Sequence, residues 1–169
     1  MPDKPNIVFI GMMGTFKTAV SAIVAKETGL PLYDTDTIFT ERYGAIADFF
    51  DKEGEKAFRQ REAEIVEEVA ALAPAIISTG GGVVLSPRNM AILKHNGRVV
   101  QLSASAAAIN SRVHGGRGRP LLKGDTMSNI VRILTERQPL YKRYADFTVD
   151  NTRLTPETCA QKVMQLLRI

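Results

Sequence analysis

The stretch NIVFIGMMGTFKT, residues 6–18, decides the fold class of this chain. It contains the apolar run Ile7–Ile10, and such a continuous run is typical of a β-strand that is buried on both faces. Gly11 ends the run, and a helical pattern follows from about Lys17 to Glu27. The stretch therefore predicts a strand, a tight loop and a helix, which together form the opening unit of an α/β fold.

The loop between this strand and this helix matches a phosphate-binding pattern with one defect. The pattern G-x-x-x-x-G-K-[ST] is met at Gly11, Lys17 and Thr18, but Phe16 stands where the second glycine belongs. In such a loop the backbone N–H groups surround phosphates, the lysine reaches the β- and γ-phosphates, and the threonine holds Mg²⁺. The alternative is a plain strand–helix turn in which Gly11 and Gly14 serve only as turn residues.

Short β-rich runs alternate with longer helical patterns along the rest of the chain. Further strands are predicted near residues 32–33, 75–78, 98–102 and 147–149. Further helices are predicted near residues 37–43, 55–72, 104–113, 127–144 and 156–167, and one more begins at Pro87. The alternation predicts a three-layer α/β/α fold with a five-stranded parallel sheet, and the length suits a single domain, 1–169. Sites in such sheets lie at the carboxyl ends of the strands, which selects the loops 11–18, 34–36, 79–82 and 114–123.

Composition and charge exclude several classes of protein. Hydrophobic residues make up 44% and charged residues 24%, as in ordinary globular proteins. No apolar run approaches the ~20 residues that span a bilayer, no secretory signal is visible, and the single Cys159 cannot form an internal disulfide or a cysteine-built metal site. We therefore expect a cytoplasmic protein. The net charge is −6 over residues 34–68 and +9 over residues 69–169, but the basic residues stand singly, which favours a small polyanion over nucleic acid.

Three other loops carry residues suited to phosphoryl chemistry. Asp34 and Asp36 could contact Mg²⁺-bound water, act as a general base or bind a substrate hydroxyl, or an aspartate there could only cap the next helix. The three glycines at 80–82 could let backbone amides approach a ligand, or they could form a plain turn. Arg117 and Arg119 lie in a glycine-rich loop that suits a lid over phosphates, or a solvated loop.

Taken together, these motifs resemble the shikimate kinase family, which has the fold of the nucleoside monophosphate kinases. The resemblance extends from about Asn6 to Leu167. It rests on segments that occur in order and at suitable spacing: Gly11–Gly14 with Lys17-Thr18, YDTD at 33–36, Gly54-Glu55 with Phe58-Arg59 and Glu62, STGGGVV at 78–84, RPLL at 119–122 and ERQPLY at 136–141.

The resemblance implies an activity and a set of partners. The expected reaction is the ATP-dependent phosphorylation of the 3-hydroxyl of shikimate to shikimate 3-phosphate, a step of aromatic amino acid biosynthesis, with Mg²⁺ as the cofactor. Shikimate and ATP are the expected partners, and the resemblance implies a monomer that binds neither nucleic acid nor a membrane. A substrate-binding region is expected at about residues 34–62 and a lid at about residues 112–124.

The resemblance also implies a role for individual residues. Shikimate would be bound by Asp36, Arg59, Glu62, Gly80, Gly81, Gly82 and Arg137. ATP would be bound by Gly14, Thr15, Phe16, Lys17, Thr18, Ala19, Arg112, Arg119 and Arg153. The catalytic residues would be Lys17, Asp34 and Arg119, and the metal would be held by Thr18 and Asp34. The two substrate arginines fit this reading, because a guanidinium forms two parallel hydrogen bonds to a carboxylate.

The chain departs from the family pattern in the phosphate loop. Phe16 replaces the glycine before the lysine, Ala19 replaces the usual hydroxyl residue, and the stretch 44–50 is one residue shorter. A Cβ-bearing residue in left-handed torsions costs about 1–2 kcal/mol. Phe16 is therefore expected to weaken ATP binding, and Phe16→Gly to improve it by about tenfold or more. The alternative is a ring that points away from the phosphates, with helical torsions and an intact loop.

Two other functions stay open. The chain could be a catalytically weak protein that binds shikimate-like anions without turnover, which a nucleotide titration would detect. It could also be a P-loop kinase for another small hydroxy-acid such as gluconate, which a substrate panel would detect.

Overall fold

All five strands lie in one parallel sheet, in the order β2-β3-β1-β4-β5. The computed structural model describes residues 4–113 and 126–169. The strands are β1 (Asn6–Ile10), β2 (Leu32–Asp34), β3 (Ile76–Ser78), β4 (Gly97–Ser103) and β5 (Phe147–Asp150). The predicted five-stranded parallel sheet is confirmed, and each strand lies within one residue of its predicted bounds.

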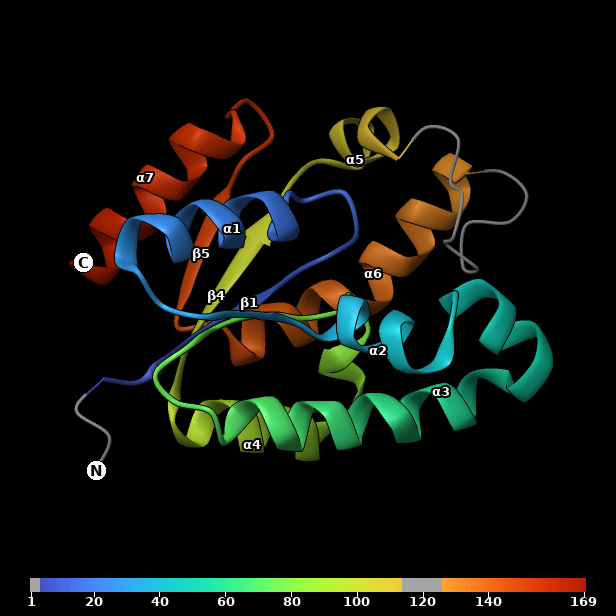
Figure 1. The fold of residues 1–169 in the computed structure, drawn as a ribbon. Helices are drawn as coiled ribbons and strands as arrows, with labels where there is room; N and C mark the ends of the chain where they lie inside the picture. The colour runs from blue at the N-terminus through green and yellow to red at the C-terminus, as the bar shows by residue number, and fades with distance from the viewer. Residues whose placement is uncertain (1–3, 114–125) are drawn as a thin grey trace.

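Helices cover both faces of the sheet and complete the predicted three layers (Figure 1). One face carries α1 (Lys17–Thr28) and α7 (Pro156–Leu167), which pack on each other. The other face carries α3 (Ile46–Ala70), α4 (Pro87–His95) and α6 (Thr126–Tyr144). The shorter elements are α2 (Thr35–Tyr43), the 3-10 turn η1 (Val83–Leu85) and α5 (Ala106–Arg112).

Strand β1 contributes to the hydrophobic core on both sides of the sheet. Ile7 and Phe9 pack with the residues of α1 and α7, whereas Val8 and Ile10 pack with those of α3, α4 and α6. All four side chains are buried. This two-sided burial explains why the sequence of β1 is a continuous apolar run rather than an alternating one.

Helix α3 differs from its prediction, which placed a helix near residues 55–72. The observed element consists of two helical segments that meet at a kink at Gly54, where φ is 86° and ψ is 168°. The segment after Gly54 matches the predicted helix, and the segment from Ile46 to the kink was not predicted. Phe49 and Phe50 lie on the added N-terminal part and pack against the core beside Phe39 and Phe58. Aromatic packing therefore stabilises a helical turn that its flanking glycines do not favour. No helix in the described ranges 4–113 and 126–169 is long and apolar enough to cross a membrane.

The strand order places a topological switch point beside β1. The chain passes from β1 to β2 and β3 on one side, and then crosses to β4 on the other. A switch point leaves a crevice at the carboxyl ends of the strands, where ligands bind in such folds. Three of the four predicted loops, which begin at Gly11, Asp34 and Thr79, meet at this edge. The fourth predicted loop, 114–123, lies outside the described residues.

Candidate active site

The loop after β1 turns at two glycines with positive φ. Gly11 and Gly14 have φ of 145° and 76°, which side chains rarely allow. A Cβ on Gly11 would strike the carbonyl oxygen of Leu102. Lys17 begins α1, and its Nζ donates to the carbonyl oxygens of Gly11 at 2.7 Å and Met12 at 3.0 Å. The lysine ammonium is therefore held against the backbone of the loop, at the N-terminus of a helix.

Phe16 keeps the left-handed conformation of the glycine that it replaces. It is the N-cap residue of α1, with φ of 65° and ψ of 21°. Its ring packs against the apolar cluster between the sheet and α1 and α7, and the Cζ of Arg112 stands 3.8 Å from the ring centroid. The ring thus points into the protein, as one of the two interpretations of the sequence expected. The backbone torsions of Phe16, however, are left-handed and not helical. The loop retains its turn at a backbone cost of about 1–2 kcal/mol.

Arg112 joins the phosphate loop to the segment after β5. Its guanidinium donates to the carbonyl oxygen of Gly14 at 3.1 Å and to the Oδ1 of Asn151 at 2.9 Å. It also donates to the Asn151 carbonyl at 2.8 Å, and the Asn151 Nδ2 donates to the carbonyl of Thr15 at 2.8 Å. Burial lowers the pKa of Arg112, and Asp150 opposes this shift. These hydrogen bonds connect the carbonyl groups of Gly14 and Thr15 in the loop to Arg112 and Asn151. The contact of Arg112 with ATP stays a prediction.

Asp34 caps the helix that follows it, and its role toward a metal ion or a substrate hydroxyl stays a prediction. One carboxylate oxygen caps α2, because it accepts hydrogen bonds from the N–H groups of Asp36 and Thr37 at 3.0 Å each. The other oxygen accepts from the Oγ1 of Thr18 at 3.3 Å. A hydroxyl and a carboxylate at the edge of a phosphate loop are the oxygen ligands that Mg²⁺ takes together with water and phosphates. The residues present therefore fit a magnesium ion.

Gly80, Gly81 and Gly82 follow β3 and form a turn, the glycine turn, that lies against charged side chains. A Cβ on Gly80 would lie 2.7 Å from an oxygen of Asp36 and 3.2 Å from one of Glu62. A Cβ on Gly82 would lie 2.6 Å from the Cζ of Arg59, and one on Gly81 would lie 3.5 Å from the Nη1 of Arg137. The glycine turn, itself predicted to bind shikimate, therefore lies against the four other predicted shikimate ligands: Asp36, Arg59, Glu62 and Arg137.

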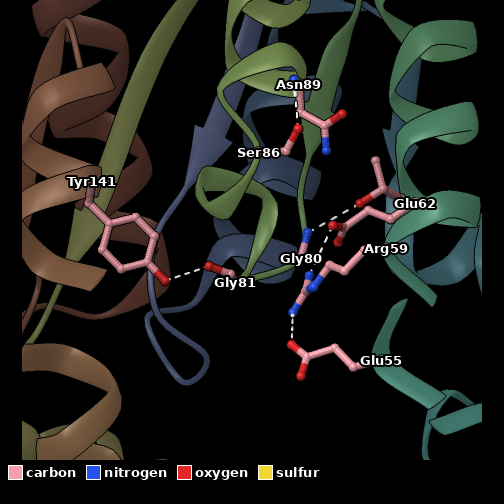
Figure 2. Close-up of polar contacts among 9 residues, drawn as sticks. Glu55, Arg59, Glu62, Gly80, Gly81, Ser86, Asn89 and Tyr141 are labelled. Atoms are coloured by element: carbon pink, nitrogen blue, oxygen red, sulfur yellow. Dashed lines mark hydrogen bonds and ion pairs between the residues drawn. The ribbon is translucent and has the colours of Figure 1, made fainter. Parts of the chain in front are cut away.

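Arg59 is held by two carboxylates on its own helix. Its Nη1 donates to the Oε1 of Glu62 at 2.9 Å, and its Nη2 lies 3.5 Å from the Oε1 of Glu55 (Figure 2). Glu62 is only 4% exposed, and burial raises the pKa of its carboxyl although Arg59 opposes the shift. The Oε2 of Glu62 has no hydrogen-bond partner among the described residues, and it faces the glycine turn. Glu62 thus positions Arg59 and presents an acceptor to the pocket.

The other residues that were predicted to bind ATP are Thr15, Ala19, Arg119 and Arg153. Thr15 is buried, and its hydroxyl donates to the carbonyl of Met12 at 2.7 Å. Ala19 is exposed in the first turn of α1, and Arg153 is exposed after β5. Arg119 and most of the predicted lid lie outside the described residues. The predictions for these residues stay predictions.

Sequence reasoning missed several residues that shape the pocket. Thr35 accepts the N–H of Gly80 at 3.1 Å, and Tyr141 donates to the carbonyl of Gly81 at 2.6 Å. Glu55 and Asn151 hold Arg59 and Arg112, as described above. Tyr141 carried a usable signal, since it follows Arg137 by four residues on a helix and so shares its face. Asn151 carried none, because its partners are distant in sequence.

A glycine-rich loop with a lysine at the switch point of a parallel sheet, beside a cluster of two arginines and two carboxylates, is typical of P-loop kinases that act on a small anionic molecule. The comparisons with known proteins specify the family. The family model "Shikimate kinase" matches residues 13–168. The shikimate kinase of Caldicellulosiruptor bescii is 42% identical over 163 residues, which cover 95% of this chain and 94% of that protein. The chain belongs to the shikimate kinase family.

Other relatives and solved structures agree. The shikimate kinase of Thermodesulfovibrio yellowstonii is 40% identical over 162 residues, which cover 95% of this chain and 93% of that protein. The shikimate kinase of Acinetobacter baumannii, solved in complex with shikimate, superposes with a TM-score of 0.95 at 31% identity, over 99% of this chain and 94% of that one. The shikimate kinase of Aquifex aeolicus superposes with a TM-score of 0.84 at 28% identity, over 96% of each chain.

Proposed function

We propose that this chain transfers the γ-phosphoryl group of ATP to the 3-hydroxyl of shikimate, giving shikimate 3-phosphate and ADP in the synthesis of aromatic amino acids. The observation that carries the proposal is the approach of Asp36, Arg59, Glu62 and Arg137 to one glycine turn beside the phosphate loop. Membership of the shikimate kinase family supports the same reaction.

The substrate pocket suits a cyclic carboxylate with several hydroxyls. We assign the carboxylate to Arg59 and Arg137, since two guanidinium forks match its planar oxygens. Asp36 would accept hydrogen bonds from the ring hydroxyls, and Glu62 would hold Arg59 in place. The N–H groups of the glycine turn, Gly80–Gly82, would approach the ring because no side chain intervenes. Gluconate also has a carboxylate and several hydroxyls. A substrate panel therefore distinguishes a shikimate kinase from a gluconate kinase.

The phosphate side supplies positioning and neutralisation of charge, which is what phosphoryl transfer demands. The N–H groups of residues 14–18 would bind the β- and γ-phosphates. Lys17 would leave the carbonyls of Gly11 and Met12 and pair with the charge that develops on the transferring group. Asp34 would accept a hydrogen bond from metal-bound water or from the attacking hydroxyl. Thr18 and Asp34 would hold Mg²⁺, which would supply positive charge that offsets the negative charge of the phosphates.

The regions of the chain follow from these roles. Residues 34–62 would form the substrate-binding region and residues 112–124 the lid, within a single domain, 1–169. Arg119 would approach the phosphates from the lid. A monomer in the cytoplasm, with shikimate and ATP as its partners, stays the prediction for this protein.

Phe16 is the one feature that favours the weak-binding alternative, and its geometry allows a sharp test. The free protein already holds the left-handed backbone at Phe16, so the strain opposes folding rather than ATP binding. The ring contacts Arg112 and the apolar cluster. We therefore expect Phe16→Gly to change ATP affinity by less than about threefold, in place of the tenfold gain expected from sequence. Phe16→Ala is the matched variant, because it removes the ring and retains the Cβ.

Titration of all three proteins with ATP and Mg²⁺, followed by calorimetry, checks this prediction. Similar dissociation constants mean that the ring does not obstruct the phosphate loop. A tenfold gain in Phe16→Gly alone assigns the obstruction to the Cβ, and a gain in both variants assigns it to the ring. Either gain supports the weak-binding alternative for the natural sequence.

A further inference from the structure

We infer that Tyr141 is a positioning residue of the shikimate pocket, which fixes the glycine turn and Arg137 relative to each other. The inference rests on the proposed function and extends it to a residue outside the predicted site. Tyr141 lies on α6 and is fully buried. Its hydroxyl group points toward Gly81 of the glycine turn (Figure 2).

The phenol joins two parts of the pocket that are distant in sequence. Its hydroxyl donates to the carbonyl oxygen of Gly81 at 2.6 Å, across 60 residues of chain. Arg137 lies one helical turn before Tyr141, and its Nη1 lies beside the same glycine, 3.5 Å from where a Cβ on Gly81 would stand. A phenol oxygen can donate one hydrogen bond and accept others at the same time. Tyr141 can therefore hold Gly81 with its proton and Arg137 with a lone pair.

The bond from Tyr141 adds Gly81 to the parts of the glycine turn that are already held, because the Gly80 N–H donates to Thr35 and the carbonyls of Gly80 and Gly82 accept from Val83 and Leu85. Three successive glycines have more backbone freedom than any other tripeptide, and they carry no side chain that could hold the turn. The carbonyl of Gly81 and the N–H of Gly82 belong to one planar trans peptide and point in opposite directions. A bond that fixes the Gly81 carbonyl toward α6 therefore also fixes the Gly82 N–H away from it. Gly82 stands against the guanidinium of Arg59, so the same bond sets the spacing of both arginines.

The phenol remains a donor over the physiological pH range. Burial raises the pKa of Tyr141 to about 12, although Arg137 and Arg59 oppose the shift. A phenolate could not donate to the carbonyl of Gly81. The neutral phenol thus provides a link that does not change between pH 6 and pH 9.

Tyr141→Phe tests the inference, because it retains the buried ring and removes only the hydroxyl. We expect the dissociation constant for shikimate to rise by about tenfold, since a buried carbonyl loses its partner. The KM for ATP and kcat should stay within about twofold, because the hydroxyl acts on the position of the carboxylate ligands. The methyl ester of shikimate has no carboxylate charge for Arg137, and its weaker binding should change by less than about threefold. Tyr144→Phe, one turn later and half-buried, is the matched control.

A second readout tests the link without any substrate. Hydrogen exchange of the peptide that spans residues 80–85 should be faster in free Tyr141→Phe than in the wild type and in Tyr144→Phe. Unchanged exchange there would overturn the inference. Equal weakening of shikimate and its methyl ester, or a parallel loss of ATP affinity, would reduce Tyr141 to a packing residue and also overturn it. If the wild type itself does not bind shikimate, the proposed function fails, and the exchange experiment still decides whether the link exists.

Discussion

Replacing Arg137 by alanine is expected to weaken shikimate binding by roughly 30-fold or more, while ATP affinity stays within about twofold. Arg137 is only 5% exposed, and it stands beside Gly81 at the glycine turn. Removal of one partner from a buried charge pair costs on the order of 2–5 kcal/mol, because the substrate carboxylate keeps its charge and loses its counterion. ATP binding should be spared, because we assign Arg137 to the substrate carboxylate and the phosphates to the N–H groups of residues 14–18.

Two further variants make this result specific. Arg137→Lys retains the charge but not the planar fork, so it should recover only part of the affinity. Arg143→Ala removes an exposed arginine from the same helix and should bind shikimate as the wild type does. Calorimetry with shikimate and with ATP gives both affinities. Equal losses of shikimate and ATP affinity in Arg137→Ala would indicate a folding defect and would remove Arg137 from the pocket.

Replacement of Lys17 by methionine is expected to lower kcat by about 10²–10³-fold, with a much smaller effect on the KM for shikimate. The Nζ of Lys17 donates to carbonyls of the loop that we propose to bind the phosphates, where negative charge would develop on the transferring group. Methionine has a similar length and no charge, so it removes the electrostatic contribution with little change in volume. The loss should fall on kcat, because the charge is greater in the transition state than in bound ATP.

Lys26→Met is the control for this variant, since Lys26 is exposed in the last turn of the same helix. Steady-state rates of ADP release, measured for both variants over a range of shikimate and ATP concentrations, separate kcat from KM. A Lys17→Met protein with wild-type kcat would place the transferring phosphate elsewhere. A loss confined to the KM for ATP would limit Lys17 to ground-state binding.

The local features of the fold were accessible from the sequence. The apolar run of β1 and the alternation of strands and helices predicted the sheet, and the structure confirms it. The helices predicted near residues 127–144 and 156–167 occur as α6 and α7. These features depend on residues that are close in sequence, so their physical cause is visible in short windows.

The parts that could not be predicted depend on contacts between distant segments. The direction of the Phe16 ring is decided by Arg112, which is far along the chain and held by Asn151. The helical turn before Gly54 depends on packing against Phe39 and Phe58. The bond from Tyr141 to Gly81 joins the sixth helix to the turn after β3. A sequence pattern shows none of these contacts. The family motifs do contain the two arginines, Arg59 and Arg137, that lie beside the glycine turn, and their binding of shikimate stays a prediction.

The most direct test of the proposed function is the release of ADP by the wild-type protein in the presence of ATP and Mg²⁺, measured with and without shikimate by a coupled assay. We expect ADP release that requires shikimate, saturates as its concentration rises and is not supported by gluconate at equal concentration. The proposed function would be contradicted if shikimate binds in calorimetry but does not raise ADP release above the rate without shikimate. The chain would then be a binding protein.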